Sequence, residues 1–400
     1  MGMKIMKKAV VILVIAVCGI IMAACNPDMS REPEDTGKKT ADDGTKSEGG
    51  NVAQGGRLDS YPDPKIVTDK EMKVYYIHST TAYESQFRSI WTAKVETAHR
   101  GWTLVDLEYE NASEYLDLFN TAMNDPGTAS IICGIVAGFE GYGDAVVEAR
   151  NKGIGVYSND NVVISGIISN CSMPSGVAAS ELTYQVCELY NWDLNYCILT
   201  AKAARLHMER SEVFRSLAPL FNNMRELAYD DGSSNSAAAT LYSFDIVKAW
   251  LEKYDDMEWI FSTNDNNAIN AAEAITAAGR EDEIFTSGFG GGSNCWQYIR
   301  NDTPFKFSYA QPYELMTHNV FQIIEEIQIK GLYPGEEGAS LSFAGETLYF
   351  PGVLVSKNNV PDIGESIHSI FDYYAPEDKD AWYNWTDGPG ILYVTDGTTQ

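Results

Sequence analysis

The feature that most constrains the fold is a repeated exchange between two hydrophobic periods, which begins at Lys73. Short apolar runs rich in β-branched and aromatic residues indicate buried strands, and apolar residues at i, i+3, i+4 and i+7 indicate helices. The first such pair is a strand over 73–78 and a helix over 87–98. Strands that alternate with helices predict an α/β protein, because parallel strands need crossover connections that helices supply.

The alternation continues to residue 355. Further strands are expected over 102–109, 130–136, 153–158, 163–169, 195–201, 224–229, 259–262, 284–289, 305–310 and 347–355. Helices are expected between them, over 115–122, 141–152, 177–189, 209–224, 236–254, 268–278, 296–300 and 318–330. This length suits two domains, so we expect two doubly wound lobes with parallel sheets. Ligands bind at the carboxyl ends of such strands, which predicts a ligand cleft between the lobes.

The N-terminus has the pattern of an export signal. Lys4, Lys7 and Lys8 precede an apolar run over 9–22, which is shorter than the roughly 20 residues that a spanning helix needs. The run ends in Ala23-Ala24-Cys25, which resembles the lipobox of bacterial lipoproteins. We therefore expect 1–24 to be a lipoprotein signal peptide and Cys25 to carry the lipid that holds the protein on the extracytoplasmic face of a membrane.

The segment 25–68 is polar and contains very few large aliphatic residues. It cannot bury enough apolar surface to offset the entropy of ordering, so a flexible tether is expected. The whole chain carries a net charge of −27, which argues against nucleic acid or anionic lipid as a partner.

Cysteines beyond Cys25 give no disulfide pattern. The expected mature chain has an odd number of them, and none forms a CxxC pair. They are Cys133, Cys171, Cys187, Cys197 and Cys295. We interpret most of them as small buried apolar residues. The sequence is also compatible with a Cys171–Cys187 or a Cys187–Cys197 disulfide.

Several short motifs occur in the order typical of one family. They are the loop 79–84, the strand end 154–160, the helix start 210–214, the segment 261–268 and the segment 308–312. Together they resemble the type I substrate-binding proteins of ABC sugar importers, the ribose- and galactose-binding class, over roughly residues 70–355. The resemblance implies two lobes joined by a multi-strand hinge. It also implies ligand contacts from Ser79, Thr80, Tyr83, Asn159, Asp160, Arg210, Asn264, Asp265 and Gln311.

Each candidate also has a structural interpretation. Carboxylates bind vicinal hydroxyls and an arginine fork donates to sugar oxygens, but Asp160 and Asn264 also suit caps. Tyr83 and Trp296 can stack on an apolar sugar face or belong to the core. The family has an aspartate in a G-F-D-G motif where this chain has Gly290, and its D-N pair at the first hinge crossing is replaced at 171–174. The motifs thus support the fold better than they support ribose or galactose as the ligand.

The resemblance also divides the chain. It predicts one lobe from 69–162 plus 311–355 and a second lobe from 163–310. Residues 356–400 are aromatic and acidic, and we expect an ordered extension packed on one of the lobes.

The sequence therefore predicts a lipid-anchored binding protein that delivers a polar small molecule, most simply a carbohydrate, to an ABC permease. A sensor that presents its ligand to a chemoreceptor or histidine kinase is the alternative. No GxSxG, HExxH or zinc-type cluster occurs, so we expect neither an enzyme nor a cofactor or metal.

Overall fold

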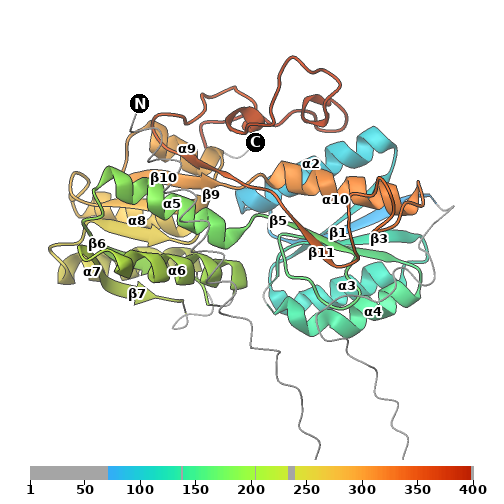
Figure 1. Ribbon diagram of the computed structural model, residues 1–400, viewed down its shortest axis with the longest axis horizontal. Coiled ribbons are helices and arrows are strands. Elements are labelled where there is room, and N and C mark those ends of the chain that lie inside the picture. The colour runs from blue at the N-terminus through green and yellow to red at the C-terminus, as the bar shows by residue number, and fades with distance from the viewer. Residues whose placement is uncertain (1–70, 137, 203, 233–238, 398–400) are drawn as a thin grey trace, which may run out of the picture. The chain divides into compact units, whose positions relative to one another are not determined.

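The computed structural model describes residues 71–136, 138–202, 204–232 and 239–397, and side chains are not described for 239–242. The predicted signal peptide, Cys25 and the tether lie outside these residues. The described chain forms two lobes, each a six-stranded sheet with helices on both faces (Figure 1). This confirms the predicted fold class.

The first lobe contains a sheet in the order β11-β5-β4-β3-β1-β2. Its strands are β1 Lys73–Ser79, β2 Thr103–Tyr109, β3 Thr128–Cys133, β4 Gly155–Asn159, β5 Ser169–Ser172 and β11 Glu346–Tyr349. Its helices are α2 Glu84–Arg100, α3 Tyr115–Asn124, α4 Gly143–Asn151 and α10 Tyr313–Gln328. Helices α2 and α10 pack together on one face of the sheet, and α3 and α4 lie on the other (Figure 1).

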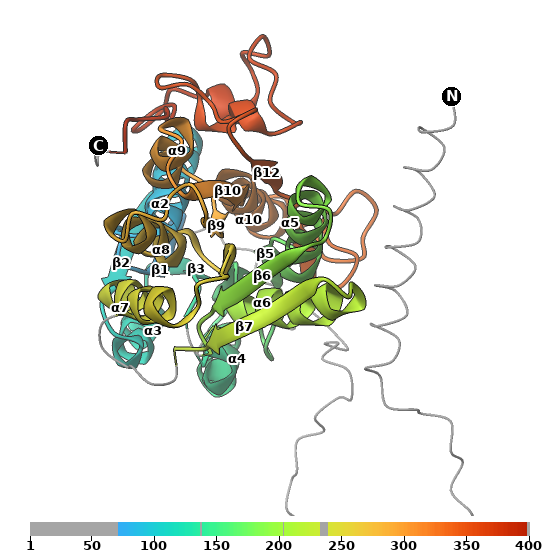
Figure 2. The same cartoon turned by 90° about the vertical axis from the view of Figure 1, so that its left-hand side faces the viewer.

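The second lobe repeats this plan with the order β12-β10-β9-β8-β6-β7. Its strands are β6 Leu194–Leu199, β7 Met224–Asp230, β8 Trp259–Ser262, β9 Phe285–Gly290, β10 Phe305–Ala310 and β12 Val353–Val355. Its helices are α5 Ser175–Leu189, α6 Arg205–Leu217, α7 Ala239–Lys253, α8 Asp265–Ala277 and α9 Ser293–Arg300. Helices α5 and α6 pack together, as do α7 and α8 (Figures 1 and 2).

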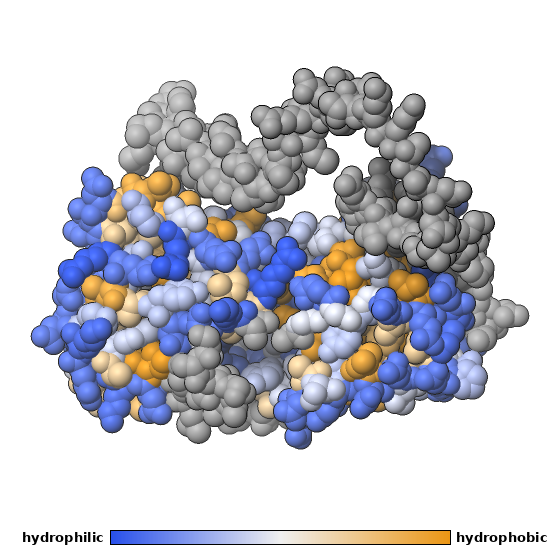
Figure 3. All heavy atoms as spheres, turned by 90° about the horizontal axis from the view of Figure 1, so that it is seen from below, coloured by the Kyte–Doolittle hydropathy of each residue, from blue (hydrophilic) through white to orange (hydrophobic). Residues whose placement is uncertain are grey.

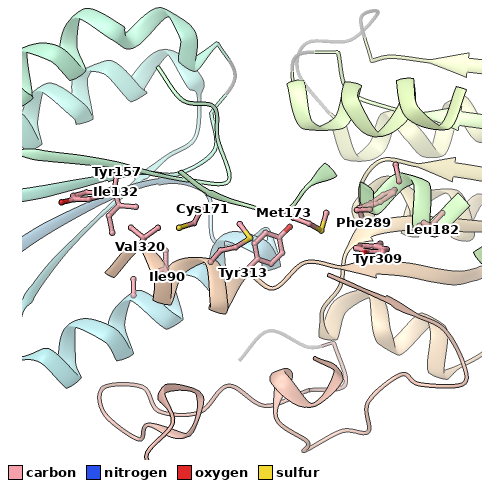
Figure 4. Close-up of a cluster of buried hydrophobic side chains, with 14 of the residues drawn as sticks. Ile90, Ile132, Tyr157, Cys171, Met173, Leu182, Phe289, Tyr309, Tyr313 and Val320 are labelled. Carbon is pink, nitrogen blue, oxygen red and sulfur yellow. The ribbon is translucent and has the colours of Figure 1, made fainter. Parts of the chain in front are cut away.

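One apolar cluster runs from the first lobe through the crossing segments into the second. Figure 4 shows Ile90 and Val320 in the first lobe, Phe289 in the second, and Met173 and Tyr313 between them. All five side chains are buried, which gives the connection between the lobes a packed apolar interior.

The lobe boundaries differ from the predicted ones. The strand expected over 163–169 is β5 at Ser169–Ser172, and it pairs with β4 and β11 of the first sheet. The strand expected over 347–355 is two strands, because Pro351 and Gly352 interrupt it, and its second half pairs antiparallel with β10. The chain therefore crosses between the sheets near 173–174, 311–312 and 350–352. Apolar period reveals that a strand exists but not which sheet it joins.

The extension after β12 contacts both lobes (Figures 1 and 2). On the second lobe Arg300 donates to the carbonyls of Pro361 at 2.8 Å and Thr395 at 2.9 Å. On the first lobe the indole of Trp382 stacks on His318 with ring centroids 4.4 Å apart. The extension thus packs on both lobes, where the sequence predicts contact with one.

We expect Trp382→Ala to lower the free energy of unfolding by about 1–3 kcal/mol, since a half-buried indole loses part of the contacts of a core aromatic. Leu220→Ala is the control, because Leu220 is 66% exposed and its loss is expected to change stability by less than about 0.5 kcal/mol. Denaturant unfolding measures both. Equal effects would show that the extension contributes little.

All five cysteines of the described residues are buried and unpaired, so neither of the two possible bridges forms. Burial raises the pKa of Cys133 to about 12, which makes that thiol unreactive.

Within the described ranges no helix is long and apolar enough to cross a membrane. The surface seen in Figure 3 is largely hydrophilic, with separate apolar patches over both lobes.

Candidate ligand-binding site

A cavity of about 280 Å³ lies between the lobes, where the carboxyl ends of strands from both sheets meet. Seven predicted residues line it: Ser79, Tyr83, Asp160, Arg210, Asn264, Asp265 and Gln311. The volume lies near the lower end of the range for small-molecule pockets, so it suits one small ligand. Among the described residues no group of His, Cys, Asp and Glu could hold a metal ion.

Gln311 links the two lobes across the floor of this cavity. Its amide donates to Asp160 Oδ2 of the first lobe at 3.3 Å, and its Oε1 accepts from the Arg210 guanidinium of the second lobe at 3.0 Å. Tyr313 donates to the same Oε1 at 2.8 Å. A carboxylate, an amide and a guanidinium thus form one continuous hydrogen-bonded row.

Arg210 is 2% exposed, and α6 presents it to the cavity. Its guanidinium donates to the carbonyl of Thr263 at 2.9 Å and lies over the Phe289 ring, 4.9 Å from the centroid. These contacts fix the fork in place. The Arg210 Nε also donates to Ser175 Oγ at 3.3 Å. A guanidinium has five donors, so donors remain for acceptors on a ligand.

Asp160 follows β4 with φ +57°, in the left-handed region that residues other than glycine seldom adopt. Its Oδ1 accepts from Ser172 Oγ at 3.0 Å. Burial raises the pKa of Asp160, against the opposing effect of Arg210. Backbone strain of this kind is commonly kept where it positions a functional side chain, and here it turns a carboxylate toward the cavity.

Asp265 supplies a second carboxylate from the first turn of α8. It accepts from the Gly291 backbone at 2.6 Å and from Ser308 Oγ at 2.9 and 3.0 Å. A Cβ at Gly290 would lie 2.9 Å from Asp265 Oδ2. The family motif has its aspartate at position 290, and here the Asp265 carboxylate occupies the space beside that position instead.

Asn264 is the N-cap of α8, and its side chain accepts from the Asn267 backbone at 2.8 Å. Asn264 therefore caps a helix, as its structural interpretation has it, and it also lines the cavity.

Three predicted residues lie outside the cavity wall. Thr80 accepts from the Ala82 backbone at 3.2 Å and so shapes the loop after β1. Asn159 donates to Tyr76 Oη at 2.7 Å and Thr317 Oγ1 at 2.9 Å inside the first lobe. Trp296 is fully buried in the core of the second lobe, so it offers no face to a ligand.

Several lining residues were not predicted as ligand contacts, although some of them lie inside the motifs of the resemblance. They are Glu84, Gln86, His207, Asn266, Asn267, Phe289, Asn294 and Tyr313. His207 lies one turn before Arg210 on α6, a spacing that could have revealed it. Burial lowers the pKa of His207 to about 3, helped by Arg210, so its imidazole is neutral at ordinary pH.

The family model described as periplasmic binding protein domain matches residues 110–325. The chain belongs to the periplasmic binding protein domain family. The match covers parts of both lobes and so includes the cavity side chains Asp160, Arg210 and Asp265. No curated protein matches the sequence.

Solved structures share the fold of this periplasmic binding protein domain. A sugar ABC transporter protein from Yersinia enterocolitica subsp. enterocolitica 8081 is 17% identical, with TM-score 0.65, over 79% of this chain and 94% of its own. An ABC transporter solute binding protein from Agrobacterium vitis with bound allitol is 18% identical, with TM-score 0.61, over 73% and 98%. A chain of the XylFII–LytSN complex is 20% identical, with TM-score 0.61, over 72% and 99%.

Proposed function

We propose that this protein is a lipid-anchored binding protein that captures a carbohydrate between its lobes and delivers it to an ABC importer permease. The observation that carries the proposal is the row from Asp160 through Gln311 to Arg210, which crosses from one lobe to the other at the cavity. A ligand bound there contacts both lobes at once.

The chemistry of the cavity suits a polyhydroxylated ligand. Each sugar hydroxyl both donates and accepts, so a carboxylate such as Asp160 and a guanidinium such as Arg210 can each bind more than one oxygen. The ring of Tyr83, which is 40% exposed and lines the cavity, can supply an apolar surface for the C–H face of a sugar. The relative with bound allitol, a polyol, supports this ligand class.

The three crossing segments support a hinge. Closure of two lobes around a ligand by hinge bending is the usual motion of periplasmic binding proteins. Exclusion of water strengthens each hydrogen bond in the closed cavity. A permease would then recognise the closed pair of lobes.

A thermal-shift panel of pentoses, hexoses, amino sugars and polyols tests the ligand class. A carbohydrate at about 100 times its dissociation constant is expected to add about 2.7 kcal/mol to the stability of the folded protein. Nucleosides and amino acids serve as controls. No shift with any carbohydrate would refute the proposal, and a shift with a control alone would assign another ligand class.

The anchor is tested separately through Cys25, which lies outside the described residues. We expect Cys25→Ser to move the protein from the membrane fraction to the soluble fraction, because the thiol that accepts the lipid is removed. Detergent phase partition of cells that express each form measures the change. Membrane retention of the variant would contradict lipid attachment at this position.

One comparison favours the sensor as a second candidate. The XylFII–LytSN complex contains a protein of this fold bound to a second component. Uptake of the radiolabelled carbohydrate found by the panel separates the two candidates. Loss of uptake on deletion of this protein supports the importer, and unchanged uptake supports the sensor.

A further inference from the structure

A carboxylate of the first lobe caps a helix of the second lobe. Glu84, in the first turn of α2, accepts from the backbone amides of Ser293 at 2.5 Å and Asn294 at 2.7 Å. These amides belong to the first turn of α9, where free N–H groups and the helix dipole favour a negative charge. The N-cap residue of α9 is Gly292, which has no side chain to cap the helix.

The glycines before α9 make room for this contact. Gly292 has φ 171°, an extended conformation open to any residue, so its backbone does not require glycine. The three atoms nearest to a Cβ built at Gly292 all belong to the Glu84 carboxylate, and the Cβ would overlap them. The absence of a side chain at 292 thus admits the carboxylate from the other lobe.

Arg88 makes a second contact between the lobes, one turn along the same face of α2. Its guanidinium forms a bidentate pair with Glu314, at 2.6 and 2.7 Å, and donates to the carbonyl of Gly291 in the loop between β9 and α9. It also donates to the Gln311 carbonyl at 3.1 Å. Three of the four positions 291–294 are therefore hydrogen-bonded to side chains of α2.

We propose that Glu84 is a positioning residue that holds the segment 290–294 against the first lobe and thereby favours the closed cleft before ligand arrives. We call Glu84, Arg88 and Gly292 the interlobe clamp. The role rests on the proposed binding function, because the segment supplies Gly290, Gly291 and Asn294 to the cavity wall. Apparent affinity scales with the fraction of protein already in the binding-competent state.

The clamp predicts a specific coupling between two positions. Gly292→Ala should expel the Glu84 carboxylate and so mimic Glu84→Ala. In the Glu84→Ala background the added methyl group should enter the space that the carboxylate has left, and Gly292→Ala should then have little further effect. Such a double-mutant cycle isolates the interaction between the two positions.

The readout is the distance between the lobes of the ligand-free full chain. Spin labels on keto amino acids at the exposed positions Asp117 of α3 and Glu212 of α6 avoid the native cysteines. Glu209→Gln is the matched control, because Glu209 accepts from the Gly176 backbone at 3.1 Å and caps α5 within the second lobe. Glu84→Gln, which keeps size and one acceptor, is the conservative variant should Glu84→Ala fold poorly.

We expect Glu84→Ala to raise the ratio of open to closed protein about tenfold, the factor that corresponds to 1.4 kcal/mol, and Glu84→Gln to raise it less. Glu209→Gln should leave the distance unchanged. An unchanged distance in folded Glu84→Ala, or full additivity with Gly292→Ala, would overturn the clamp. Because the measurement uses no ligand, its failure leaves the proposed carbohydrate function standing, whereas a negative carbohydrate panel leaves the distance result intact.

Discussion

Replacement of Arg88 by methionine is expected to lower the free energy of unfolding by about 3–5 kcal/mol, the cost typical of breaking a buried ion pair. Its partner Glu314 has a side chain only 2% exposed and would keep a buried charge without a counterion. Burial acts to raise the pKa of Glu314, but Arg88 holds that pKa below its usual range. The Gly291 and Gln311 carbonyls would also lose their donor.

Denaturant unfolding of Arg88→Met and two comparison variants checks this prediction. The double variant Arg88→Met with Glu314→Leu should recover part of the loss, since an apolar pair replaces an uncompensated charge. Arg215→Met is the control, because Arg215 and its partner Glu226 form a largely exposed pair worth less than about 1 kcal/mol. If Arg88→Met lowers the free energy of unfolding no more than the control does, the Arg88–Glu314 pair does not stabilise the fold as expected.

Replacement of Arg210 is expected to have the largest effect on binding. Truncation of a buried hydrogen-bonded charge costs about 2 kcal/mol or more, so Arg210→Ala should weaken carbohydrate affinity by at least about 30-fold. Arg210→Lys should also lose most of the affinity, because an ammonium group cannot reproduce the planar fork that reaches Thr263 and Gln311.

Isothermal titration with the carbohydrate identified by the panel measures these losses. Arg215→Ala, on the same helix but exposed, is the matched control and should bind like the unchanged protein. Circular dichroism establishes that each variant is folded. Full affinity in folded Arg210→Ala would place the ligand elsewhere.

The fold was largely predictable because hydrophobic period is a local property. The strand at 73–78 and the helix that follows it differ in period within a few residues, and the structure has β1 and α2 there. Sheet membership is not local. The strand pattern over 347–355 gives no sign that Tyr349 pairs in one sheet and Val353 in the other.

The lining of the cavity was predictable where a side chain follows a strand or opens a helix, as with Asp160 and Asp265. It was not predictable where tertiary packing decides orientation. Trp296 carries an indole that could stack on a sugar, but α9 directs this side chain into the core that the extension covers. The role of Glu84 depends on α9 of the other lobe, more than two hundred residues away in sequence, and no local pattern reports such a contact.

A structure of the protein crystallised with the carbohydrate that stabilises it most is the most direct test of a ligand site shared by the two lobes. We predict one sugar molecule in the cavity between the lobes, within hydrogen-bond distance of Asp160 from the first lobe and Arg210 from the second. A sugar bound outside this cavity, or one that contacts only a single lobe, would contradict the account.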